Sequence, residues 1–108
     1  MKYSLLIILL TVYLVNANET GRLNGLVLDG QGLPVIGASV MIVGTEVGTM
    51  TDPNGEYLLY NLEPGIISVV ARMVGKSSQT LQGLNVIGGM TTRADFELHD
   101  ETQGSTII

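Results

Sequence analysis

The sequence of 108 residues contains no cysteine and no tryptophan, and it has a single histidine and a single phenylalanine. Without cysteine the chain can form no disulfide, no cysteine-ligated metal site and no thiol nucleophile. Positive charge is also scarce, with 5 Lys and Arg against 10 Asp and Glu and a formal net charge of −5. So acidic a chain offers no basic face for DNA or RNA, and nucleic acid is therefore not an expected partner.

A long apolar run occurs only at the start of the chain. Lys2 provides a short positive start, residues 5–15 are almost wholly apolar, and small side chains end the run at Ala17. This pattern predicts a signal peptide over residues 1–17, and hence export to the periplasm, outer membrane or cell surface. An uncleaved membrane anchor is the alternative, but the run is shorter than the ~20 residues that a spanning helix needs. A lipid anchor of the bacterial lipoprotein kind would require a cysteine, which the chain lacks.

From residue 18 onward the apolar residues alternate with a period of two, and no window keeps a helical spacing without a Gly or Pro. Tyr57 and Leu59 share one strand face, as do Ala94, Phe96 and Leu98, and we expect both aromatic rings in the core. The pattern predicts no helix and seven short strands, over residues 22–28, 38–43, 48–51, 56–60, 66–73, 80–86 and 91–98.

Turn residues separate these strands. The strongest signal is Asp52-Pro53-Asn54-Gly55, which predicts a hairpin turn because Pro presets one torsion and Asn-Gly readily takes positive φ. Seven strands in about ninety residues match an all-β, two-sheet antiparallel sandwich. We expect the domain over residues 18–98 and a polar C-terminal tail over 99–108.

The succession of glycines, short apolar strands and turn residues resembles the carboxypeptidase-regulatory-like domain. The resemblance covers residues 22–98 and implies a seven-stranded Greek-key β-sandwich of the transthyretin type. The segments that carry it are Gly25-Leu26-Val27-Leu28-Asp29, Gly32-Leu33-Pro34-Val35-Ile36-Gly37-Ala38-Ser39-Val40, Gly44-Thr45, Gly48-Thr49, Thr51-Asp52-Pro53-Asn54-Gly55-Glu56-Tyr57, Leu62 and Pro64-Gly65.

The chain departs from the family pattern at one corner. After the fifth strand the family usually has Gly-Tyr, whereas this chain has Gly75-Lys76, so an aromatic that covers the sandwich edge is replaced by a lysine. We therefore expect altered packing at this corner.

Two local features could suggest a metal site or a catalytic base. His99 stands beside Asp100 and Glu101, but a ligand or base needs convergent partners that the sequence does not supply. Asp52-Pro53-Asn54-Gly55 is similar to the opening of a calcium loop, yet no closing Glu follows at the required spacing. We expect a solvated histidine, a simple turn and no metal.

Nucleophilic catalysis by serine is not expected either. The serines have only His99 as a possible base, and none lies in a glycine-flanked elbow. The transthyretin-like hydrolases of the urate pathway use several histidines and a characteristic C-terminal motif, whereas this chain ends at Ile108 with one histidine. Lys76 is the only lysine after residue 2 and follows the fifth strand, which is the wrong place for the isopeptide bond of Cna B-type domains. The serines considered are Ser39, Ser68, Ser77, Ser78 and Ser105.

Binding by stacking or by strand addition remains open. With Tyr57 and Phe96 in the core, only Tyr60 could stack on a sugar ring, so carbohydrate is a weakly supported ligand. The unpaired edges of an open sandwich can accept a partner strand without special residues, which favours protein contacts.

According to the resemblance, the domain is not enzymatic and often follows the signal peptide of TonB-dependent outer-membrane receptors. We expect a non-catalytic exported module, structural or protein-interacting, with no cofactor. Its expected place is the periplasmic N-terminal extension of such a receptor, and its partners are the receptor plug and barrel or other envelope proteins. The alternatives are a stand-alone periplasmic or secreted binding module and an accessory domain of a secreted peptidase or glycosidase. Because 108 residues hold no plug or barrel, the chain is expected to be a truncated reading frame or a free-standing module.

Overall fold

Residues 19–101 are described by a computed structural model of the chain; the predicted signal peptide and residues 102–108 of the predicted tail lie outside them. The described residues form strands and turns, and none of them forms a helix that is long and apolar enough to cross a membrane. The strands are β1 (Gly21–Asp29), β2 (Ser39–Ile42), β3 (Gly48–Met50), β4 (Glu56–Leu62), β5 (Gly65–Arg72), β6 (Gln79–Val86), β7 (Thr91–Arg93) and β8 (Phe96–Leu98).

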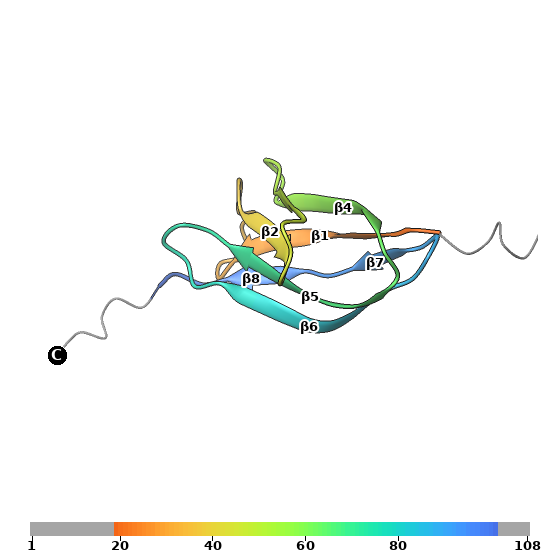
Figure 1. Cartoon of the computed structure of the whole chain (residues 1–108). Coiled ribbons are helices and arrows are strands. Elements are labelled where there is room, and N and C mark those ends of the chain that lie inside the picture. The colour runs from red at the N-terminus through yellow and green to blue at the C-terminus, as the bar shows by residue number, and fades with distance from the viewer. Residues whose placement is uncertain (1–18, 102–108) are drawn as a thin grey trace, which may run out of the picture.

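The strands build two sheets that face each other (Figure 1). One sheet has the order β4-β1-β7, with β8 also paired to β1, and the other has the order β3-β2-β5-β6. The predicted all-β sandwich of two sheets is therefore confirmed.

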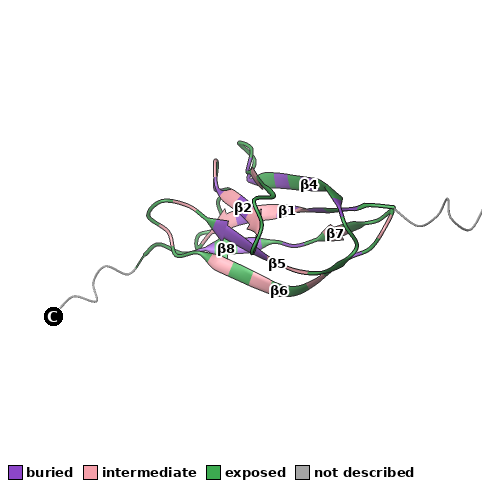
Figure 2. Cartoon of the chain, in the orientation of Figure 1, coloured by how far each residue is buried: buried purple, intermediate pink, exposed green. Residues whose placement is uncertain are grey.

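The core lies between the sheets, where the inward faces of the strands meet (Figure 2). The alternation in the sequence predicted these faces correctly, because side chains at every second position of a strand point to the same side. The fully or nearly fully buried apolar side chains are Leu23, Val27, Val35, Ala38, Val40, Tyr57, Leu59, Leu62, Val69, Ala71, Val86, Ala94, Phe96 and Leu98.

The pairing of β1 differs from the expected antiparallel arrangement. β1 runs antiparallel to β4 but parallel to both β7 and β8, so the sandwich is mixed. The single strand predicted over residues 91–98 is broken at Ala94 and Asp95, and eight strands result in place of seven.

The break has a steric cause in β1. A Cβ atom on Gly25 would lie 1.8 Å from the Ala94 carbonyl oxygen, so this carbonyl occupies the space that a side chain would fill. Hydrogen bonds hold the break on both sides: the Ala94 amide donates to the Asn24 carbonyl over 2.8 Å, and the Leu26 amide donates to the Asp95 carboxylate over 2.8 Å. The missing side chain of Gly25 thus leaves room for the Ala94 carbonyl at the break, and the last strand continues along the same side of β1 in the same register.

The turn at residues 52–55 has the predicted local structure but joins different partners. The Asp52 carboxylate accepts hydrogen bonds from the amides of Asn54 and Glu56, each over 2.9 Å, and the Gly55 amide closes the turn on the Asp52 carbonyl. The predicted hairpin is wrong, however, because β3 pairs with β2 in one sheet while β4 pairs with β1 in the other. The turn carries the chain across the sandwich.

Candidate functional site

The corner at Gly75-Lys76 is the region where the sequence departs from the family pattern. Lys76 does not leave a gap there: its ammonium group donates to Asp100 over 2.9 Å, and the two residues form an isolated antiparallel bridge. The Ser77 amide donates to the His99 carbonyl over 2.8 Å and the Glu101 amide to the Gly75 carbonyl over 3.1 Å. Residues 99–101, expected in the tail, are therefore fastened to the loop after β5.

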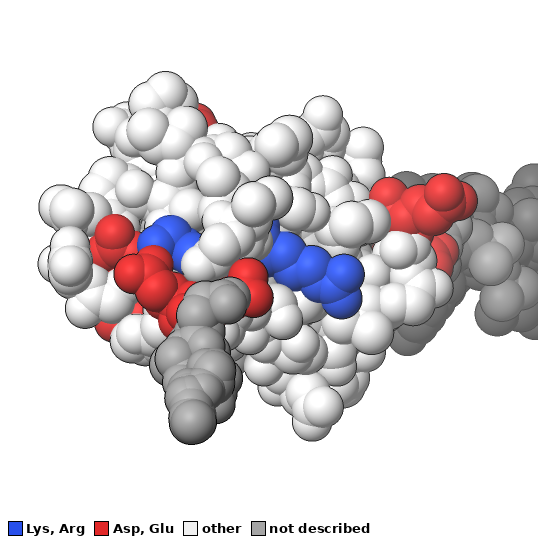
Figure 3. All heavy atoms as spheres, turned by 90° about the vertical axis from the view of Figure 1, so that its left-hand side faces the viewer, with Lys and Arg blue, Asp and Glu red and all other residues white. Residues whose placement is uncertain are grey.

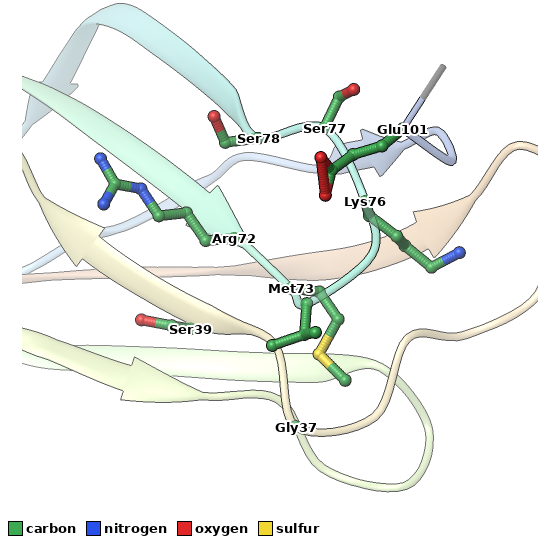
Figure 4. A pocket seen from close by; sticks show the side chains of 9 residues that line it. Gly37, Ser39, Arg72, Met73, Lys76, Ser77, Ser78 and Glu101 are labelled. Carbon is green, nitrogen blue, oxygen red and sulfur yellow. The ribbon is translucent and has the colours of Figure 1, made fainter. Parts of the chain in front are cut away.

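A groove of about 740 Å³ opens beside this corner (Figure 4). The Met73 side chain lies between those of Arg72 and Lys76, which point to opposite sides. The labelled polar side chains do not converge on one point (Figure 4). Its lining consists of Gly37, Ser39, Arg72, Met73, Val74, Lys76, Ser77, Ser78 and Glu101.

Charges at this end of the molecule are mixed, as Figure 3 shows. The hydrogen bond to Asp100 raises the pKa of Lys76 above its usual range, and the charges of Asp100 and Asp29 add to this effect. The amides of Leu33 and Gln31 lower the pKa of the Asp29 carboxyl, because both donate to it. Lys76 therefore stays a cation and is unsuited to act as a nucleophile.

His99 lies at the surface next to Glu97. Its Nε2 atom is 3.1 Å from the Glu97 carboxylate, and both side chains are more than half exposed. No group of three His, Asp or Glu side chains within residues 19–101 is placed to hold a metal ion. The imidazole is thus an exposed partner of one carboxylate.

The candidate serines are dispersed over the molecule. Ser39 and Ser77 line the groove from opposite elements, Ser68 lies on β5, and Ser105 lies outside the described residues. No described serine hydroxyl forms a hydrogen bond with the His99 ring. The described chain brings no hydroxyl nucleophile and base together.

Tyr57 and Phe96 are buried, as predicted, and their rings pack at a centroid distance of 6.0 Å and an angle of 57°. The Tyr57 hydroxyl donates to the Ala94 carbonyl at the break between β7 and β8. Burial raises the pKa of this phenol well above its usual range, and the nearby Asp95 charge adds to the shift. Tyr60, by contrast, is 64% exposed on β4, together with Leu58 at 47%.

Thr51 is a structural residue that the sequence analysis did not single out. Its side chain is buried, accepts a hydrogen bond from the Ala38 amide over 2.8 Å and donates to the Val35 carbonyl over 2.6 Å. A threonine directly before the Asp-Pro turn was the only available signal, and it does not reveal these distant partners.

Known proteins resemble this chain in sequence and in fold. The profile of the carboxypeptidase regulatory-like domain family matches residues 22–99. The TonB-dependent receptor P39 of Formosa agariphila is 31% identical over 80% of this chain and 8% of the receptor. The TonB-dependent receptor SusC of Bacteroides thetaiotaomicron is 39% identical over 71% of this chain and 7% of the receptor. The chain therefore spans less than a tenth of the length of these receptors.

A solved structure supports the fold alone. A chain of a mutant type II cohesin–X-dockerin complex from Acetivibrio cellulolyticus superimposes with a TM-score of 0.65 at 17% identity, covering 82% of this chain and 64% of that one.

Proposed function

The chain belongs to the carboxypeptidase regulatory-like domain family, and from this premise we propose that it is the non-catalytic, periplasmic N-terminal module of a TonB-dependent outer-membrane receptor. The observation that carries the proposal is the kind of match to the two receptors. They align with most of this chain but with less than a tenth of their own length, so the shared part is a small domain within a much longer receptor.

The site geometry supports a role in binding rather than catalysis. Within residues 19–101 the polar side chains of the groove beside Lys76 diverge, and the single histidine pairs with a surface carboxylate. What the described residues do offer is exposed backbone and apolar surface at a sheet edge, which suits contact with another polypeptide. The domain would thus contact the plug, the barrel or another envelope protein.

The receptor assignment is tested by the DNA beyond the codon for Ile108. An in-frame plug and a long series of alternating strands would establish it. A stop codon in that frame, together with recovery of the protein from the soluble periplasmic fraction, would contradict it and favour a stand-alone module.

Export is tested separately. Residues 1–17 are fused to a reporter enzyme that folds only outside the cytoplasm, with Leu9→Arg in the apolar run as the matched control. We expect activity from the natural segment, loss of activity with Leu9→Arg, and cleavage directly after Ala17, detected by mass spectrometry of the reporter. Full-length, unprocessed protein in the membrane fraction would show an anchor instead.

The absence of catalysis is tested with esterase, peptidase and glycosidase substrates. We expect no turnover above that of His99→Ala. Reproducible hydrolysis that disappears with this substitution would overturn the non-catalytic assignment.

A further inference from the structure

The outer edge of β4 presents free backbone groups. The Val27 amide donates to the Gly55 carbonyl directly opposite, so this is a hydrogen-bonded pair of the ladder between β1 and the chain entering β4. In an antiparallel ladder such pairs recur at every second residue, which assigns Tyr57 and Leu59 to bonds with β1. The amides and carbonyls of Leu58 and Tyr60 therefore point away from β1.

The neighbouring residue Glu56 confirms this direction. Its amide and carbonyl are bonded to Asp52, which lies outside the ladder with β1. Further along, neither Leu58 nor Tyr60 has a backbone partner on the outer side among residues 19–101. Two consecutive outward positions of β4 are thus available for another strand.

The usual protection of edge strands is missing at these positions. Sheet edges are normally shielded by a charged side chain, a proline or a bulge. Between Tyr57 and Tyr60 there is no charge and no proline, and the register shift of the ladder comes only at Asn61, where φ is 58°. The exposed Leu58 and Tyr60 side chains stand on the same outer face.

The opposite edge of the sandwich shows what shielding looks like in the same molecule. β6 contains a bulge at Gly83, where φ is 74°. Two residues of β6 also bond to the opposite sheet. The Asn85 carbonyl accepts a hydrogen bond from the Thr92 hydroxyl over 2.8 Å, and the Gln79 side-chain oxygen accepts one from the Glu97 amide over 2.7 Å.

We propose that β4 pairs antiparallel with β4 of a second copy of this chain, about a two-fold axis at Leu59. This register places Leu58 opposite Tyr60 of the partner subunit and Tyr60 opposite Leu58 of the partner subunit. Both pairs can exchange two hydrogen bonds, because all four residues present their backbone groups outward. The same register sets an aromatic ring beside an aliphatic side chain twice on the outer face, a favourable cross-strand pair.

Charge is compatible with this pairing. The joint is limited to the pairs made by Leu58 and Tyr60, because the outer backbone groups of Glu56 are already bonded to Asp52, and these pairs carry no charge. Each copy is acidic overall, with a net charge of −5 for the chain, and added salt therefore strengthens the association by screening the long-range repulsion.

The test uses the chain from residue 18, since every residue of the buried core cluster lies between Leu23 and Leu98. Sedimentation equilibrium is run over about a hundredfold range of concentration, at low and at moderate salt. Tyr60→Lys places a charge at the joint, and Ile66→Lys places the same charge on a β5 side chain that is 67% exposed, close to the 64% of Tyr60. We expect the mass to rise to twice the monomer value, with Tyr60→Lys weakening the dimer at least about tenfold and Ile66→Lys leaving it unchanged.

Amide hydrogen exchange identifies the edge. The Tyr57 and Leu59 amides are expected to be protected at every concentration, and those of Leu58 and Tyr60 only when the dimer forms. The proposal is overturned by a monomer at all concentrations, by a dimer in which the Leu58 and Tyr60 amides exchange freely, or by equal weakening in the two lysine variants. None of these outcomes depends on whether the chain is exported or belongs to a receptor.

Discussion

The two lateral openings of the sandwich are closed in different ways. Where β6 meets β7 and β8, side chains bond to the backbone of the opposite sheet, as Thr92 does with Asn85. Where β3 meets β4, the sheets are joined by the turn at Asp52 and by the buried hydroxyl of Thr51, and β4 keeps a free outer edge. The first side is held by side chains that bond across to the opposite sheet, while the second is held by a turn and a buried hydroxyl that leave the outer edge of β4 unpaired. The sandwich can therefore bond its β6 edge to the opposite sheet while leaving the β4 edge open to another strand.

The largest expected effect on stability comes from adding a side chain at Gly25, where the Ala94 carbonyl occupies the space. In Gly25→Ala the new Cβ would collide with the Ala94 carbonyl, a backbone group that cannot rotate away. We expect the free energy of unfolding in urea to fall by about 3 kcal/mol.

Gly30→Ala is the matched control for this substitution. Its Cβ would lie 2.7 Å from Nδ1 of His99, but that ring is exposed and can move. An equal loss of stability in both variants would show that the close approach of the Ala94 carbonyl to Gly25 does not determine the stability of this region.

Removing the buried hydroxyl on the other side should cost less. Thr51→Val keeps the shape of the side chain but leaves the Ala38 amide and the Val35 carbonyl without their partner. We expect a loss of about 2 kcal/mol, because each group stays buried and unsatisfied. Thr51→Ser retains the hydroxyl and should recover most of this loss in the same denaturation experiment.

Tyr57 links the core to the break between β7 and β8, and its contribution should depend on pH. Tyr57→Phe removes the donor to the Ala94 carbonyl and should cost about 1 kcal/mol at neutral pH. Folding raises the pKa of the phenol above its ordinary value of 10.0, so the neutral form is favoured in the native state. The stabilisation is therefore complete below pH 10 and is lost as the pH rises further.

Thermal denaturation between pH 8 and pH 11, as approximate limits, measures this effect. The parent chain should lose more stability than Tyr57→Phe above pH 10. Parallel curves for the two proteins would contradict the assignment to this phenol.

The smallest expected effect concerns a single bond at the edge of β6. Thr92→Val deletes the hydroxyl that bonds to the Asn85 carbonyl while keeping a β-branched side chain. Since the bond lies near solvent, we expect a loss of about 0.5 kcal/mol. The change should be seen in faster hydrogen exchange along β6, and a loss as large as that of Thr51→Val would erase the contrast between the two sides.

The sequence was sufficient for the parts of this fold that depend on alternation and on turn chemistry. The positions of Tyr57 and Phe96 in the core follow from period-two patterning, and the Asp52 turn follows from its residue types. The break at Ala94 could not be predicted, because it depends on the absence of a side chain at Gly25, far away in sequence. The predicted hairpin between β3 and β4 was wrong because a turn motif does not determine which sheet the following strand joins.

The candidate groove was predictable only in part. The replacement of an aromatic residue by Lys76 drew attention to the corner beside which the groove opens, while the pairing of His99 with Glu97 was not predicted. The free edge at Leu58 and Tyr60 was foreseen only as a general property of open sandwiches. Its exact position depends on the ladder register with β1, which is a tertiary property.

The parallel pairing of β1 with β8 has a mechanical consequence. The described chain enters the sandwich at one end, through β1, and leaves it at the other, after β8 (Figure 1). Tension applied between these two points would pull the neighbouring strands past each other along their length. Their hydrogen bonds would then carry the load in shear and would have to break together rather than one after another. A small domain with this strand arrangement resists unfolding when its two ends are pulled apart.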